Sequence, residues 1–218
     1  MLSFLMPILA FGAAWGLILL TPGTETALII RLSLSVGHRA AIGAVAGIVT
    51  GVGLWGFGTI FGVSAIISAS KTAFTVIQWA GALYLLYLSL RLIWQSVKGF
   101  SKKEAEQLSE EQSESDIKTS DSFNAGFRRG SLTTLLNPLV GVFDMTAFPH
   151  FIPVGQNAVT YSFALVFTQM VTTLFWYSIV AGMALSLGRF FANPKIIRIL
   201  DMITGIFFLF FAAKLVLI

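Results

Sequence analysis

The chain has 218 residues, of which 56% are hydrophobic and only 11% are charged, and its mean hydropathy is +0.84. A soluble domain carries about 25% charged residues, so this composition excludes a soluble globular protein. The apolar runs are long and continuous, which is typical of membrane-spanning helices. The net charge of +4 follows from membrane orientation, so we expect no nucleic acid partner. Cysteine is absent, which excludes disulfides and thiolate metal ligands.

Six apolar segments are long enough to cross a bilayer, at about residues 4–36, 40–66, 72–94, 123–153, 160–187 and 196–217. The first and the fourth exceed the length of one span, and each contains a proline that should interrupt a helix, Pro22 and Pro138. We therefore predict an all-α integral membrane protein with six transmembrane helices. These helices would form two inverted three-helix repeats, with helices 1 and 4 broken at the two prolines.

The predicted repeats are residues 1–97 and 123–218, and the segment between them, residues 98–122, is hydrophilic. It holds seven of the ten acidic residues, among several serines. That composition predicts a flexible cytoplasmic linker, with a regulatory segment as the alternative.

Basic residues are concentrated in the links after the first, third and fifth segments. They are Arg31, Arg39, Lys98, Lys102, Lys103, Lys118, Arg128, Arg129, Arg189, Lys195 and Arg198. The positive-inside rule places these three links in the cytoplasm and both termini outside.

The two proline breaks lie at the same predicted depth. Pro22 comes nine residues before Arg31, and Pro138 comes nine residues after Arg129. Each break is therefore ~13 Å from an interfacial arginine, near the middle of a bilayer core about 30 Å thick. We expect Thr21 to cap a new helix that begins at Pro22. Two half-helix N-termini, each with about half a positive charge, would then meet at the midplane and form a substrate site.

Three acidic residues lie in or beside apolar segments, where an ionisable group usually has a partner or a pathway role. Glu25 either complements the helix dipole or acts on a substrate amine or a proton. Asp144, ~22 Å from the cytoplasmic interface, either accepts a substrate ammonium or pairs with a basic group. Asp201 is three residues from Arg198, which predicts an ion pair on one helix face.

Small and polar residues within the segments have two interpretations each. The ridge Gly43, Gly47 and Gly51, and likewise Gly126 and Gly130, allow close helix approach, either within the chain or at a homodimer face. Several polar side chains either line a polar path or form single hydrogen bonds between helices. They are Gln78, Thr168, Gln169, Thr172 and Thr173.

The motifs at Thr21-Pro22-Gly23 and Asn137-Pro138-Leu139 resemble those of the LysE/RhtB family of amino-acid exporters. The run from Gly81 to Leu88 looks like the third helix of that family, and the stretch ending in Pro149-His150-Phe151 looks like its fourth. The resemblance covers nearly the whole chain. It implies export of small metabolites across a bacterial inner membrane, driven by an ion or proton gradient, and no enzymatic activity.

Three residues depart from the family pattern. Thr24 is the third residue of the first motif where the family has proline, Leu139 replaces a lysine, and Asp144 replaces an apolar or aromatic residue. The lost cation and the added acid favour a more cationic substrate.

We expect a secondary exporter that works by alternating access, with amides at Gly23-Thr24 and Leu139-Val140 receiving a substrate carboxylate. Glu25 would bind the substrate amine or exchange a proton, and Asp144 would form a second binding position toward the outside. The expected substrate-binding residues are Pro22, Gly23, Thr24, Glu25, Asn137, Pro138, Leu139 and Asp144. The expected partners are an amino acid, the lipid bilayer and a second copy of the chain, with no cofactor, metal or catalytic residue. The alternatives are an exporter of divalent cations, with Glu25 and Asp144 as oxygen ligands, and a non-transporting membrane scaffold.

Overall fold

A computed structural model describes residues 2–98, 121–153, 155, 157–191 and 193–217, so most of the predicted linker lies outside the described residues. Helices cover all six predicted segments, and these ranges contain no strand. The helices are α1 (Leu2–Leu20), α2 (Thr24–Ser35), α3 (His38–Ala69), α4 (Lys71–Lys98), α6 (Phe123–Leu135), α7 (Pro138–Phe151), α8 (Ala158–Gly182), α9 (Ala184–Phe191) and α10 (Pro194–Leu217).

Four of the described helices, α3, α4, α8 and α10, are each long and apolar enough to cross a membrane. The pair α1 and α2, bent by 59° at its break, can add a fifth span. The pair α6 and α7 does not qualify in the same way, since α6 carries Arg128 and Arg129 and has little apolar character. The chain is an all-helical, multi-pass membrane protein.

The first predicted break is confirmed, but its cap is not where the sequence suggested. α1 ends at Leu20 because Thr21 precedes a proline, which disfavours helical dihedrals. α2 begins only at Thr24, with Gly23 as its extended N-cap residue and no side chain capping its amides. The hydroxyl of Thr21 instead forms a hydrogen bond with the hydroxyl of Thr204 on α10. The expectation that Thr21 caps a helix starting at Pro22 was wrong.

The second predicted break is also confirmed, and here the cap follows the usual rule. α6 ends at Leu135, and Pro138 is the first residue of α7, where a missing amide hydrogen costs nothing. Asn137 is the N-cap, and its Oδ1 accepts a hydrogen bond from the amide of Leu139 at 3.1 Å.

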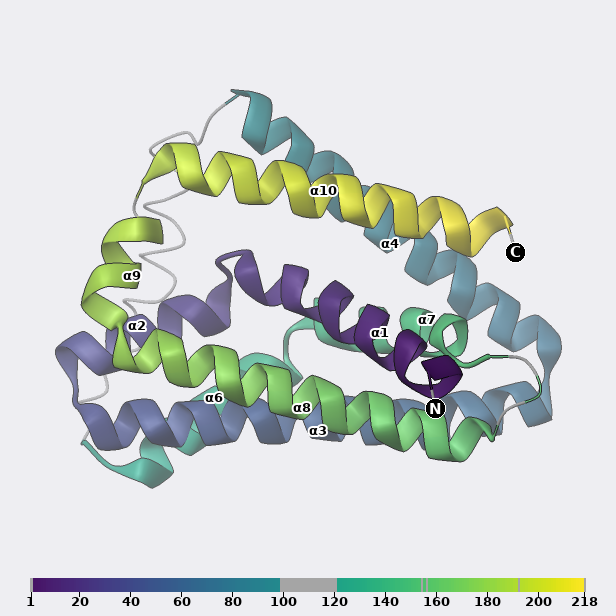
Figure 1. Cartoon of the computed structure of the whole chain (residues 1–218), viewed down its shortest axis with the longest axis horizontal. Helices are drawn as coiled ribbons and strands as arrows, with labels where there is room; N and C mark the ends of the chain where they lie inside the picture. Colours follow the sequence, from purple (N-terminus) through teal and green to yellow (C-terminus); the bar gives the residue numbers. More distant parts are fainter. Residues whose placement is uncertain (1, 99–120, 154, 156, 192, 218) are drawn as a thin grey trace.

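The long helices run roughly along one direction, with α3 antiparallel to α8 and α4 antiparallel to α10 (Figure 1). α3 and α8 lie side by side, α4 packs on α10, and α1 and α7 lie between these pairs (Figure 1). Both termini lie toward one end of the molecule. The α2–α3 turn and α9, which belong to two of the predicted basic links, lie at the other end (Figure 1).

The glycine ridge of α3 packs against α6 inside the chain. A Cβ added at Gly43 would lie 2.1 Å from the carbonyl oxygen of Phe123, and one at Gly126 would lie 1.9 Å from that of Ala40. Gly47 and Gly130 make equally close approaches to the partner backbone. The interpretation as intrachain packing is confirmed, so this ridge is not available for the predicted homodimer or for a scaffold partner.

Candidate substrate site

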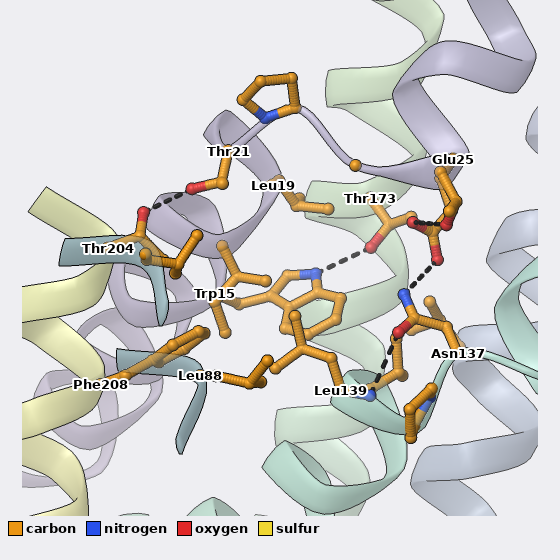
Figure 2. A pocket seen from close by; sticks show the side chains of 18 of the residues that line it. Trp15, Leu19, Thr21, Glu25, Leu88, Asn137, Leu139, Thr173, Thr204 and Phe208 are labelled. Atoms are coloured by element: carbon orange, nitrogen blue, oxygen red, sulfur yellow. Dashed lines mark hydrogen bonds between the residues drawn. The ribbon is translucent and has the colours of Figure 1, made fainter. Parts of the chain in front are cut away.

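A cavity of about 330 Å³ lies where the two helix breaks meet, bounded also by α3, α4, α8 and α10 (Figure 2). Its volume is in the range of small-molecule sites. Seven of the eight predicted substrate-binding residues line it. They are Pro22, Gly23, Thr24, Glu25, Asn137, Pro138 and Leu139.

A direct hydrogen bond joins the two breaks. The Nδ2 of Asn137 donates to Oε1 of Glu25 at 2.8 Å, and the hydroxyl of Thr24 donates to Oε2 at 3.2 Å. Figure 2 shows Glu25 and Asn137 pointing toward each other. Glu25 is only 7% exposed, yet it lines the cavity. A buried carboxylate with two neutral donors and an open side toward the cavity can accept a cationic group.

The two helix N-termini at the cavity differ in the amides that they offer. At α7 the amide of Leu139 already donates to Asn137, so it is not available for the substrate carboxylate as we had expected. At α2 no side chain caps the first turn, and Gly23 and Thr24 line the cavity. The α2 terminus is therefore the one that combines the positive end of a helix dipole with open amides.

The opposite wall is formed by α4, and its polar residues were missed by the sequence analysis. Tyr84, Arg91 and Gln95 line the cavity. In the described part of the chain, Arg91 forms no ion pair with a carboxylate. The available signal was that Arg91 lies inside the third predicted apolar segment, where a charged residue indicates a functional role.

Hydroxyl and indole groups complete the polar surface. The Nε1 of Trp15 donates to the hydroxyl of Thr173 at 2.8 Å, and both residues line the cavity (Figure 2). Of the polar residues with two interpretations, only Thr173 lines this cavity. The others form hydrogen bonds elsewhere: Thr168 and Thr172 bond to carbonyls of their own helix, and Gln78 bonds to the carbonyl of Leu215.

Asp144 and Asp201 do not line the cavity. Asp144 is 0% exposed and its Oδ1 accepts a hydrogen bond from Nε2 of Gln169 on α8 at 2.7 Å. Asp201 is 3% exposed, and its Oδ2 has no hydrogen-bond partner among the described residues. The predicted ion pair with Arg198 is not formed, because Arg198 is exposed while Asp201 is turned into the protein.

Aromatic rings close the cavity on the side of the termini. Trp15, Val140 and Phe208 line it, and one turn further along the same three helices lie Phe11, Phe143 and Phe211. The ring of Phe143 is 6.0 Å from that of Phe11 and 6.0 Å from that of Phe211, measured between centroids. Phe11 and Phe143 are fully buried. We call Phe11, Phe143 and Phe211 the aromatic layer.

The hydrogen bond between the breaks can be tested with Asn137→Asp. Aspartate caps a helix as well as asparagine does, but it turns the donor that faces Glu25 into an acceptor. The acceptor oxygens at positions 25 and 137 would then face each other without a donor, which should lower the free energy of unfolding by about 1–3 kcal/mol. Thermal unfolding in detergent measures this change. Asn157→Asp is the matched control, because Asn157 caps α8 through the amide of Thr160 and contacts no carboxylate among the described residues. Equal stability losses in the two variants would contradict the prediction.

Two interrupted helices that meet at a polar cavity inside a multi-pass helical protein define a membrane transport protein. The chain belongs to the LysE type translocator family, whose sequence model matches residues 17–218. This membership confirms the resemblance seen in the motifs, and the members of this family are transporters and not enzymes.

Two relatives match nearly the full length. The chain is 27% identical over 210 residues to the uncharacterized membrane protein YrhP of Bacillus subtilis (strain 168), covering 95% of this chain and 97% of that protein. It is 27% identical over 199 residues to the homoserine/homoserine lactone efflux protein of Salmonella typhimurium (strain LT2), covering 91% and 90%. No solved structure matches the chain.

Proposed function

We propose that this chain is a secondary exporter of amino acids, or of small amino-acid-like metabolites, that works by alternating access. The observation that carries the proposal is that Glu25 and Arg91 line the same cavity, where the two helix breaks meet. A free α-amino acid carries one ammonium and one carboxylate, and this cavity has one group of each opposite charge. The similarity to a homoserine/homoserine lactone efflux protein supports the same substrate class.

In this proposal Glu25 binds the substrate ammonium. Arg91, together with the open amides at the start of α2, binds the carboxylate, since a guanidinium and a helix N-terminus both favour an anion. Pro22, Pro138 and Leu139 shape the cavity wall. A bound ammonium would compete with Asn137 for Glu25, so substrate binding would weaken the hydrogen bond that joins the two breaks. That competition links binding to movement of one break against the other.

The proposed setting is the bacterial inner membrane, with both termini outside and the basic links in the cytoplasm. α6 and α7 together would form the sixth span. Residues 1–97 and 123–218 would then each contain three spans and form two inverted repeats. Leu92 and Gln95 extend the cavity wall toward the cytoplasmic end of α4, while the aromatic layer closes the outer side. This arrangement supports an inward-facing conformation that receives substrate from the cytoplasm. Export would be coupled to a proton or ion gradient.

The other two functions considered from the sequence have less support. An exporter of divalent cations was expected to use Glu25 and Asp144 together, but only Glu25 lines the cavity. Among the described residues no group of three or more acidic or histidine side chains is placed to hold a metal ion, and hard cations require six or more oxygen ligands. A scaffold held through the glycine ridge is not favoured, because α6 occupies that ridge.

Arg91→Gln in proteoliposomes tests the assignment of the carboxylate. We expect the variant to lose about 10- to 100-fold in apparent affinity for an amino acid, since a hydrogen bond to a charged group contributes about 1.5–3 kcal/mol. Its affinity for the corresponding amino amide, which has no carboxylate, should change little. The measurement is counterflow of radiolabelled homoserine, threonine, lysine or leucine competed by each analogue.

Arg198→Gln is the matched control, because Arg198 is exposed and does not line the cavity. Equal affinity of wild type and Arg91→Gln for the amino acid would remove Arg91 from the site. Absence of counterflow by the wild type with any amino acid, in vesicles where the protein is folded, would overturn the proposed function.

A further inference from the structure

Asp144 and Gln169 form a buried polar pair between α7 and α8, outside the cavity. Both side chains are 0% exposed, and they share one hydrogen bond of 2.7 Å, from Nε2 of Gln169 to Oδ1 of Asp144. The remaining oxygens, Oδ2 of Asp144 and Oε1 of Gln169, are buried and have no hydrogen-bond partner among the described residues. Buried oxygens of this kind normally have a donor, so two in one pair require an explanation.

If Asp144 is ionised, its Oδ2 and the Oε1 of Gln169 cannot satisfy each other, because a carboxylate oxygen and an amide oxygen are both acceptors. A protonated Asp144 has one O–H donor, and a carboxylic acid and a primary amide can exchange two hydrogen bonds. The existing bond uses the amide N–H, and a proton on Oδ2 would supply the donor that Oε1 lacks. One added proton therefore provides the missing donor and removes a charge from an apolar interior.

We propose that Asp144 and Gln169 form a proton-binding site, which carries the proton exchanged for the exported substrate. This inference rests on the proposed function and names its coupling ion. One proton from the outer aqueous phase binds to the carboxylate of Asp144 and gives the neutral acid. The same proton is later released to water on the inside. The proton is not consumed, and no electron or other group is transferred.

The described residues around Asp144 provide no counterion that would replace the proton. α7 packs against α1, α3, α4 and α6, and α8 contributes Gln169. α1 has no charged residue along Leu2–Leu20, and α3 has its charged residues at the cytoplasmic end. Within the part of the chain that the structure describes, no charged group acts on Asp144 at short range. The other titratable groups on α4, α6, α7, α8 and α10 are Lys71, Tyr84, Tyr87, Arg91, Lys98, Arg128, Arg129, His150, Tyr161, Tyr177, Lys195, Arg198, Asp201 and Lys214. A metal ion would need more ligands than the two free oxygens.

The position of the pair gives the proton a role in the cycle. Asp144 directly follows Phe143, the α7 member of the aromatic layer that closes the outer side. A neutral Asp144 can be buried behind the closed layer, whereas an ionised one favours contact with water. Binding a proton from outside would let the layer close and return the empty carrier to the inward-facing conformation.

The test compares the full-length wild type with Asp144→Asn in proteoliposomes loaded with a pH-sensitive dye. Asparagine resembles the neutral acid but cannot release a proton. We expect the variant to retain counterflow of amino acid while losing both pH-gradient-driven accumulation and substrate-induced proton flux. Thr146→Val, on the same helix, should retain all three activities, because the hydroxyl of Thr146 bonds to carbonyls of α7 and to no other described group. Gradient-driven accumulation by Asp144→Asn equal to that of wild type would overturn the proposal.

Infrared spectroscopy of the purified protein tests the site without transport. The wild type should show the carbonyl stretch of a protonated carboxylic acid that Asp144→Asn lacks. If Asp144→Asn does not fold, Gln169→Leu replaces it, and the same band should shift to higher frequency as the carbonyl loses its donor. The proton assignment would be overturned if the wild type showed no such band. It would also be overturned if a sodium gradient at constant pH drove substrate accumulation by the wild type. A wild type that shows the band but no counterflow would contradict the proposed function and leave the proton-binding site standing.

Discussion

Glu25→Gln is expected to reduce the rate of substrate efflux by about 10- to 100-fold, because the loss of one charge-assisted hydrogen bond costs about 1.5–3 kcal/mol. Glutamine is neutral and cannot form an ionic bond with the substrate ammonium. It still has an oxygen that can accept the hydrogen bond from Asn137, so the junction of the two breaks should persist. The measurement is efflux of preloaded amino acid from proteoliposomes at a fixed gradient, with thermal unfolding recorded in parallel.

Glu25→Asp is the matched variant, since it keeps the negative charge but shortens the side chain. We expect it to retain more efflux than Glu25→Gln, because charge and not shape carries the interaction. Efflux by Glu25→Gln at the wild-type rate would show that the carboxylate is not needed. A loss of stability in Glu25→Gln as large as the loss of efflux would instead indicate a structural role at the start of α2.

Gly126→Ala should lower the free energy of unfolding by about 1–3 kcal/mol, the usual cost of forcing extra volume into a packed interface. The new Cβ would lie 1.9 Å from the carbonyl oxygen of Ala40, so α3 and α6 would have to separate. Backbone atoms cannot move aside as the end of a flexible side chain can. Thermal unfolding in detergent measures the effect, which should also appear as a lower yield of folded protein.

Gly58→Ala on α3 is the control, because nothing lies within 4 Å of a Cβ added there. Alanine is also the better helix former, so this variant should be slightly more stable than the wild type, by about 0.5–1 kcal/mol. The two substitutions are chemically identical and should have opposite signs. The same sign in both would contradict the packing of α3 on α6.

The interface of α3 with α6 also bears on how the second broken helix works. α6 is short and polar, and it is held against α3 by close backbone contact and not by a large apolar surface. The bond from the Ser131 hydroxyl to the carbonyl of Gly47, at 3.2 Å, adds a polar contact at the same interface. We therefore expect α6 and α3 to move as one unit, with movement in the transport cycle at the breaks on either side of Pro22 and Pro138.

The sequence identified much of the site because position along a helix follows from counting residues. The depth estimate for Pro22 and Pro138 used only the rise per residue and the nearest arginine, and the structure brings the two breaks together through Glu25 and Asn137. The helix boundaries follow from proline and from the composition of the apolar segments. The cap at Thr21 was wrong because Pro22 and Gly23 extend the connection by two residues before α2 starts.

The direction in which each side chain points was decided only by the tertiary structure. Arg91 faces the cavity, Asp144 faces Gln169 and Asp201 is turned away from Arg198, although each was visible in the sequence as a charged residue in or beside an apolar segment. The physical reason is that the rotation of a helix about its axis is set by the neighbours on which it packs. In a membrane those neighbours are selected by small residues and single hydrogen bonds and not by a strong apolar periodicity. The amino-acid sequence by itself thus determined the class of protein and the positions of its two helix breaks, and packing determined which groups meet there.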